Sequence, residues 1–191
     1  MNTLNKLLIA SILILTSCFS SCAQQNKPTM NTSHILVAYF SATGTTEKVA
    51  HKIAAVTGGE IYEIIPENAY TREDLDWNDN SSRSSVEMND AKARPALKRK
   101  KENMEAYDTV FIGYPIWWDL APRIINTFIE SHDLKGKTLI PFATSGSSRI
   151  ENSVAVLKRT YPDLQWDNGR LLNHANDETV RKWIESIRKG K

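Results

Sequence analysis

Short apolar runs, separated by polar turns, recur along most of the chain. Three of them are mostly apolar, as in strands that are buried on both faces: Ile35–Phe40, Thr109–Tyr114 and Thr138–Ala143. The segment Glu60–Ile65 instead alternates between polar and apolar residues, which indicates a strand with one exposed face. A weak fifth strand is predicted between Gln165 and Leu172. The pattern therefore predicts five strands.

Apolar residues at helical spacing follow these strands. Helices are predicted after the first strand, from Pro122, over about Ile150–Thr160 and from Asp177. Their core faces would carry Val49, Ala50, Ile53 and Ala54, then Ile124, Ile125, Phe128 and Ile129, and finally Val180, Trp183, Ile184 and Ile187. Strands that alternate with helices are typical of a doubly wound parallel sheet. The sequence therefore predicts one α/β domain over residues 33–191.

The connection between the second and third strands, residues 67–106, is longer than a plain crossover helix requires. Its first part, Asp74–Asp90, is dense in Asp, Asn and Ser, so it is predicted to be a loop. A helix is predicted over Pro95–Lys101, with the proline in its first turn.

The N-terminal segment has the pattern of an export signal. Lys6 precedes the apolar run Leu7–Leu15, which is too short to span a bilayer. The residues from Leu15 to Cys18 resemble the bacterial lipobox, in which the cysteine is lipidated and becomes the mature N-terminus. We therefore expect a lipoprotein signal peptide over residues 1–17, lipidation at Cys18 and a flexible tether over 18–32. Cys22 is the weaker candidate for lipidation, and a plain secretory signal is the alternative.

This interpretation implies a location in the bacterial cell envelope, with the protein anchored by lipid on the periplasmic side of the inner or outer membrane. Both cysteines of the chain, Cys18 and Cys22, lie in the leader. Disulfides, cysteine-ligated metals and a cysteine nucleophile are therefore not expected in the domain. The formal net charge of +2 is too small to indicate nucleic-acid binding.

A hydroxyl-rich turn between the first strand and its helix has the features of a phosphate site. Strand, tight turn and helix direct free backbone N–H groups and the helix dipole at an anion. The turn lacks the lysine of a P-loop and the three glycines of the dinucleotide fingerprint, so it suits an isolated monophosphate. The alternative is an ordinary connection with good N-cap residues. The turn consists of Ser41, Ala42, Thr43, Gly44, Thr45 and Thr46.

Two further turns are expected beside this one, because the carboxyl ends of parallel strands share one edge of a sheet. One turn is aromatic and the other is polar, so the three together fit a flat aromatic ring joined to a phosphate. At least one of the two tryptophans is expected to contact the ligand, and the other either does so or packs in the core. The candidate residues are Pro115, Ile116, Trp117 and Trp118 in the first turn and Thr144, Ser145, Gly146 and Ser147 in the second.

With these three motifs the sequence resembles the flavodoxin family, in its flavodoxin-like FMN-binding oxidoreductase branch. The first turn is similar to the family's phosphate loop, and Gly113–Trp118 and Ala143–Ser147 are similar to its two isoalloxazine loops. The resemblance runs from about His34 to Lys189. It implies a five-stranded parallel sheet in the order 2-1-3-4-5, helices on both faces and one non-covalent FMN. Only the Trp117–Trp118 loop is expected to supply aromatic rings.

Three other features of the sequence each have two interpretations. Asn80–Ser85 could help to close the pocket, but a solvated loop is favoured. His174 could reach the same edge of the sheet, but a surface histidine is favoured. A basic cluster is interpreted as a solvated face, with anionic lipid headgroups as the alternative; it consists of Lys92, Arg94, Lys98, Arg99, Lys100 and Lys101.

Together with the lipobox-like N-terminus, the resemblance implies a membrane-anchored redox protein that transfers electrons to a protein or a small quinone-like acceptor. The chemistry would belong to the flavin, with no catalytic side chain and no metal. An NAD(P)H-dependent quinone or nitro reductase and a non-catalytic flavin-binding lipoprotein are the alternatives. The electron-carrier members of the family are strongly acidic, whereas this chain carries +2. We therefore expect the second one-electron potential of the flavin to be less negative here than in those carriers.

Overall fold

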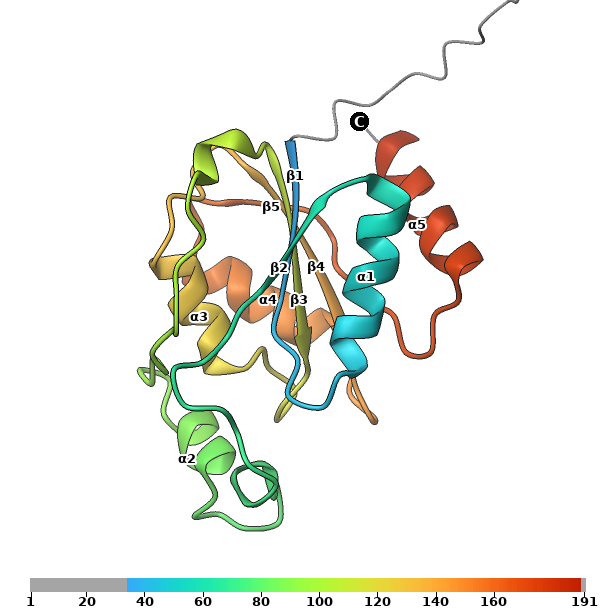
Figure 1. The fold of residues 1–191 in the computed structure, drawn as a ribbon. Coiled ribbons are helices and arrows are strands. Elements are labelled where there is room, and N and C mark those ends of the chain that lie inside the picture. The colour runs from blue at the N-terminus through green and yellow to red at the C-terminus, as the bar shows by residue number, and fades with distance from the viewer. Residues whose placement is uncertain (1–33, 190–191) are drawn as a thin grey trace, which may run out of the picture.

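The computed structural model describes residues 34–189, and its core is one twisted parallel sheet (Figure 1). The main path runs β2-β1-β3-β4-β5, and all neighbouring strands are parallel. Strand β6 also pairs with β4, further along that strand than β5 does. This arrangement confirms the predicted order 2-1-3-4-5. The strands are β1 (Ile35–Tyr39), β2 (Glu60–Glu63), β3 (Thr109–Pro115), β4 (Thr138–Thr144), β5 (Gln165–Trp166) and β6 (Arg170–Leu171).

Helices cover both faces of the sheet, as predicted (Figure 1). Helices α1 (Thr45–Thr57) and α5 (Asp177–Lys189) lie on one face, and α3 (Arg123–Glu130) and α4 (Glu151–Thr160) lie on the other. Because side chains alternate along a strand, β1 contributes to two separate hydrophobic clusters. Leu36 and Ala38 are buried on the α3–α4 face, and Val37 is buried on the α1–α5 face. The periodicity of the sequence therefore correctly predicted both cores.

The prediction of a loop over Asp74–Asp90 was wrong in part. The segment contains the 3₁₀ turn η2 (Glu73–Leu75) and the helix α2 (Arg83–Asn89). Ser82 caps α2 by accepting a hydrogen bond from the backbone N–H of Ser85, and Met88 is buried on the inner side of the helix. In Figure 1 this helix lies beyond the end of the sheet, below α3, and not against a sheet face. A short, serine-rich helix has little apolar periodicity, which is why the pattern missed it.

The predicted helix over Pro95–Lys101 is also wrong, because this segment runs beside the chain that follows β2. Leu97 forms an antiparallel bridge with Pro66. The backbone N–H of Lys98 donates to the carbonyl of Ile65 at 2.8 Å, and the N–H of Glu67 donates to the carbonyl of Ala96 at 2.8 Å. These long-range backbone partners replace the local ones that a helix would have used. Another short 3₁₀ turn, η3 (Met104–Ala106), then leads into β3.

Part of the basic cluster is paired within the fold. Arg94 forms two hydrogen bonds to the carboxylate of Glu130, each 2.8 Å long. Lys101 Nζ lies 3.1 Å from Glu60 Oε1. The cluster is therefore less available to anionic headgroups than its sequence suggested.

The predicted signal peptide, the lipidation site Cys18 and the tether fall outside the residues that the structure describes. Within residues 34–189, no helix combines the length and the apolar character needed to cross a membrane.

Candidate functional site

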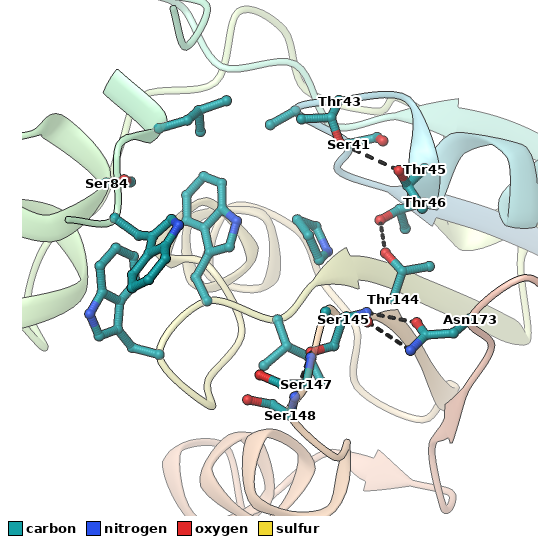
Figure 2. Close-up of a pocket in the computed structure, with 18 of the residues that line it drawn as sticks. Ser41, Thr43, Thr45, Thr46, Ser84, Thr144, Ser145, Ser147, Ser148 and Asn173 are labelled. Atoms are coloured by element: carbon teal, nitrogen blue, oxygen red, sulfur yellow. Dashed lines mark hydrogen bonds between the residues drawn. The ribbon is translucent and has the colours of Figure 1, made fainter. Parts of the chain in front are cut away.

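A cavity of about 630 Å³ lies at the carboxyl ends of β1, β3 and β4 (Figure 2). All three predicted turns line it, so the tertiary structure brings together the candidate residues that the sequence placed at separate strand ends. Gly44 is the one predicted residue that does not line the cavity. The contact of the others with a cofactor stays a prediction. They are Ser41, Ala42, Thr43, Thr45, Thr46, Pro115, Ile116, Trp117, Trp118, Thr144, Ser145, Gly146 and Ser147.

The first turn leaves the start of α1 open to a ligand. Gly44 is the N-cap residue with a φ of 79°, a left-handed conformation that glycine adopts without strain, and it supplies no side-chain cap. The first N–H groups of a helix have no partner within the helix, and the helix dipole favours negative charge there. Thr43 and Thr45 are exposed beside them, with their hydroxyl oxygens 3.5 Å apart. This end of the cavity is therefore suited to an anion.

Two polar links hold the turns in place. The hydroxyls of Thr46 and Thr144 are hydrogen-bonded at 2.8 Å and are buried, which connects α1 to the end of β4. Asn173 bonds to both backbone groups of Ser145: it accepts from the N–H at 2.8 Å and donates to the carbonyl at 2.7 Å. Asn173 also lines the cavity and was missed by the sequence analysis. The ligand-facing loops are therefore fixed by long-range hydrogen bonds.

The two adjacent tryptophans have different environments. Trp117 packs edge-on against Phe40, with ring centroids 5.5 Å apart, and against Tyr70 at 5.3 Å. Trp118 is 43% exposed and has a φ of 47°, which is uncommon for a bulky residue. A turn closed by backbone hydrogen bonds between Trp117 and Leu120 imposes this conformation. Both side chains line the cavity, and Trp117 also packs against the core.

The 67–106 segment contributes to the site more than the sequence predicted. Ser84 lines the cavity and is 2% exposed, so the favoured interpretation of Asn80–Ser85 as a solvated loop was wrong in part and holds only for Asn80 and Ser81. Leu75 and Trp77 line the cavity as well, and Trp77 adds an aromatic ring outside the Trp117–Trp118 loop. A lone tryptophan in a polar stretch was the available signal. His174 is exposed but lies at the edge of the same cavity, together with Ser148.

The chemistry of the lining fits a ligand with an anionic end and a flat ring. No Asp, Glu, Lys or Arg is among the lining residues, so an anion beside the first turn would be held by hydroxyls and backbone amides. The Oγ atom of Ser41 is buried and has no hydrogen-bond partner among residues 34–189, which leaves a donor beside the turn. These features define a doubly wound α/β protein with a phosphate-and-ring site at the strand ends, the place where such folds bind ligands.

The chain belongs to the flavodoxin family, whose sequence profile matches residues 34–187. It is similar to the structure of a candidate flavoprotein from Bacteroides eggerthii, with 65% identity over 82% of this chain and 98% of that one and a TM-score of 0.79. A candidate flavoprotein from Bacteroides uniformis is similar too, with 59% identity, coverages of 80% and 98% and a TM-score of 0.79. A Lactobacillus acidophilus flavoprotein, solved in complex with FMN, shares the fold at 21% identity, coverages of 80% and 99% and a TM-score of 0.62. A comparison with curated proteins returned no match.

Proposed function

We propose that the protein binds one FMN non-covalently in this cavity and uses it to transfer electrons to a protein or a small quinone-like acceptor. The observation that carries the proposal is the convergence of the three turns on one cavity without Asp, Glu, Lys or Arg, with an open helix N-terminus at one end. Membership of the flavodoxin family supports it. When bound, the flavin supplies the redox chemistry, and the protein supplies binding, orientation and electrostatics.

Each turn would have its own task. Thr43, Thr45 and the first N–H groups of α1 would hold the phosphate. Trp117 and Trp118 would form an apolar wall for the ring and exclude water from one side of it. The loop that begins at Thr144 would form the opposite wall, where Asn173 keeps its backbone in place.

A spectroelectrochemical titration of the purified FMN-bound protein tests this function. We expect one FMN per chain and a second one-electron potential less negative than in the strongly acidic carriers of the family. The reason is electrostatic: a carboxylate about 10 Å from the ring, at an effective dielectric of about 40, would lower that potential by roughly 35 mV. No carboxylate lines this cavity, and the chain as a whole carries +2. A second potential as low as in the acidic carriers would contradict the expectation.

The electron donor distinguishes the proposal from its alternatives. Steady-state oxidation of NAD(P)H in the presence of a quinone would identify a reductase. Rapid reoxidation of the reduced protein by a quinone, without NAD(P)H oxidation, is the result expected of a carrier. A protein that binds FMN but is neither reduced nor reoxidised at a useful rate would be a flavin-binding lipoprotein without turnover.

We further propose that the protein is anchored by lipid at Cys18 on the periplasmic side of the cell envelope. The lipobox-like residues Leu15–Cys18 support this location. Cys18→Ala is expected to release the protein from the membrane fraction or to block its processing, because the acceptor thiol is lost. Cys22→Ala is the matched control and should leave both unchanged. Membrane association and mature mass that are the same for Cys18→Ala as for the wild type would refute the anchor.

A further inference from the structure

The helix α2 places a hydroxyl without a partner in the wall of the cavity. Ser84 is 2% exposed, and it lies across the cavity from Thr45 and Thr46 in Figure 2. Within residues 34–189, two buried side-chain oxygens have no hydrogen-bond partner, and these are the Oγ atoms of Ser41 and Ser84. Both residues line this one cavity. A buried hydroxyl destabilises a fold unless something bonds to it, so both atoms indicate a ligand that the cavity receives.

Ser84 is held firmly in this position. The neighbouring Arg83 donates to Glu87 at 2.7 Å and to the carbonyl of Asn68 at 2.7 Å, and its guanidinium lies 4.0 Å from the centre of the Tyr70 ring. The Tyr70 hydroxyl donates to the Glu87 carboxylate. Burial raises the pKa of Tyr70, and the Glu87 carboxylate raises it further, so this donor stays protonated.

Contacts with distant parts of the chain connect α2 to the aromatic loop. The Tyr70 ring packs edge-on against Trp117, with centroids 5.3 Å apart. At the other end of the helix, Arg123 Nη2 donates to the carbonyl of Met88 at 2.9 Å. The unpartnered hydroxyl of Ser84 therefore belongs to a fixed wall, whose position is coupled to that of Trp117.

The same segment places a large ring at the rim. Trp77 is 72% exposed, and it lines the cavity together with Leu75. An exposed tryptophan next to a cavity offers a flat apolar surface that a bound aromatic ring could cover.

We propose that this segment forms a wall of the FMN site, in which Ser84 hydrogen-bonds a polar atom of the isoalloxazine ring and Trp77 contacts the ring surface. The inference rests on the proposed binding of FMN. Ser84 is assigned to the ring and not to the phosphate because it lies across the cavity from Thr45 and Thr46 at the start of α1, and because the same 67–106 segment contributes the Trp77 ring to the lining. The phosphate turn and the Ser84 wall therefore contact different parts of the cofactor.

The test compares FMN with riboflavin, which lacks the phosphate, in titrations of the apoprotein followed by flavin fluorescence. Ser84→Ala is expected to weaken both flavins by about five-fold, the factor that corresponds to one neutral hydrogen bond. The melting temperature of the apoprotein should not fall, because the hydroxyl that is removed has no partner there. Trp77→Ala should also weaken both flavins without loss of stability, since its side chain is exposed.

Ser81→Ala is the matched control. Ser81 is exposed on the same segment, and its Oγ donates to Asp79 at 2.7 Å and does not line the cavity. Its substitution should leave both affinities unchanged.

Each other outcome overturns the assignment of Ser84. A loss for FMN alone would place Ser84 at the phosphate, and a loss only for an added quinone would make it part of an acceptor subsite. Unchanged affinities, or an apoprotein that melts at a lower temperature, would show a structural serine. If the wild-type protein bound no FMN, the proposed function would fail first, and the inference with it. If the wild type bound FMN and Ser84→Ala left both flavin affinities unchanged, the inference would be overturned and the proposed function would stand.

Discussion

Replacement of Thr45 by alanine is expected to weaken FMN binding by about ten-fold or more and to leave riboflavin binding nearly unchanged. Thr45 is the first residue of α1, and its exposed hydroxyl lies beside that of Thr43. No lysine or arginine lines the cavity, so hydroxyls and backbone amides are the groups expected to hold the phosphate. A hydrogen bond to a charged group contributes about 1.5–3 kcal/mol, and about 1.4 kcal/mol corresponds to ten-fold in affinity.

The measurement is a titration of the apoprotein with each flavin. Thr43→Ala should act in the same way, and the double variant should lose about a hundred-fold if the two bonds are independent. Thr160→Ala, on the end of α4 and outside the cavity lining, is the control that removes an exposed threonine elsewhere. Wild-type affinities that are equal for FMN and riboflavin would show that this turn does not hold the phosphate.

Replacement of Gly113 by alanine is expected to lower the free energy of unfolding by roughly 1–3 kcal/mol, the usual effect of overpacking a core. Gly113 in β3 is paired in register with Phe142 in β4. A Cβ atom at Gly113 would lie 2.1 Å from Cζ and 2.5 Å from Cε2 of the Phe142 ring. That ring is fully buried, so it cannot move aside without disturbing the packing around it.

Urea unfolding of the apoprotein measures the effect as a shift of the midpoint, while the slope of the free energy of unfolding against urea concentration stays constant. Gly146→Ala is the control, because a Cβ atom there would have no neighbour within 4 Å. In a Phe142→Leu background, which removes the clashing ring atoms, Gly113→Ala should be less destabilising. An equal loss in both backgrounds would mean that contact with Phe142 is not the cause.

The elements that the sequence predicted well are those whose signal is local. The apolar run in β1, the helical spacing in α1 and the hydroxyl-rich turn between them are contiguous, and the structure has them where the pattern placed them. The convergence of the three turns followed from a general property of parallel sheets, in which the carboxyl ends of strands share one edge. The strand order was implied by the family resemblance, and the sheet confirms it.

Only the tertiary structure decided the 67–106 segment. The sequence indicated a loop and then a helix, whereas the chain forms α2 beyond the end of the sheet and an extended stretch paired with the chain after β2. Ser84 and Trp77 enter the cavity wall for that reason. Ser84 has no local pattern that indicates it, and a lone tryptophan in a polar stretch is only a weak signal for Trp77.

The physical reason is the distance along the chain between interacting groups. Tyr70 meets Trp117, and Arg123 bonds to the carbonyl of Met88, 35 residues earlier in the sequence. Hydrophobic periodicity reports how a segment alternates between core and solvent, and it contains no information about which distant backbone groups will pair. The sequence by itself therefore determined the sheet, its two cores and the place of the hydroxyl-rich turn, while long-range contacts decided the wall that completes the cavity.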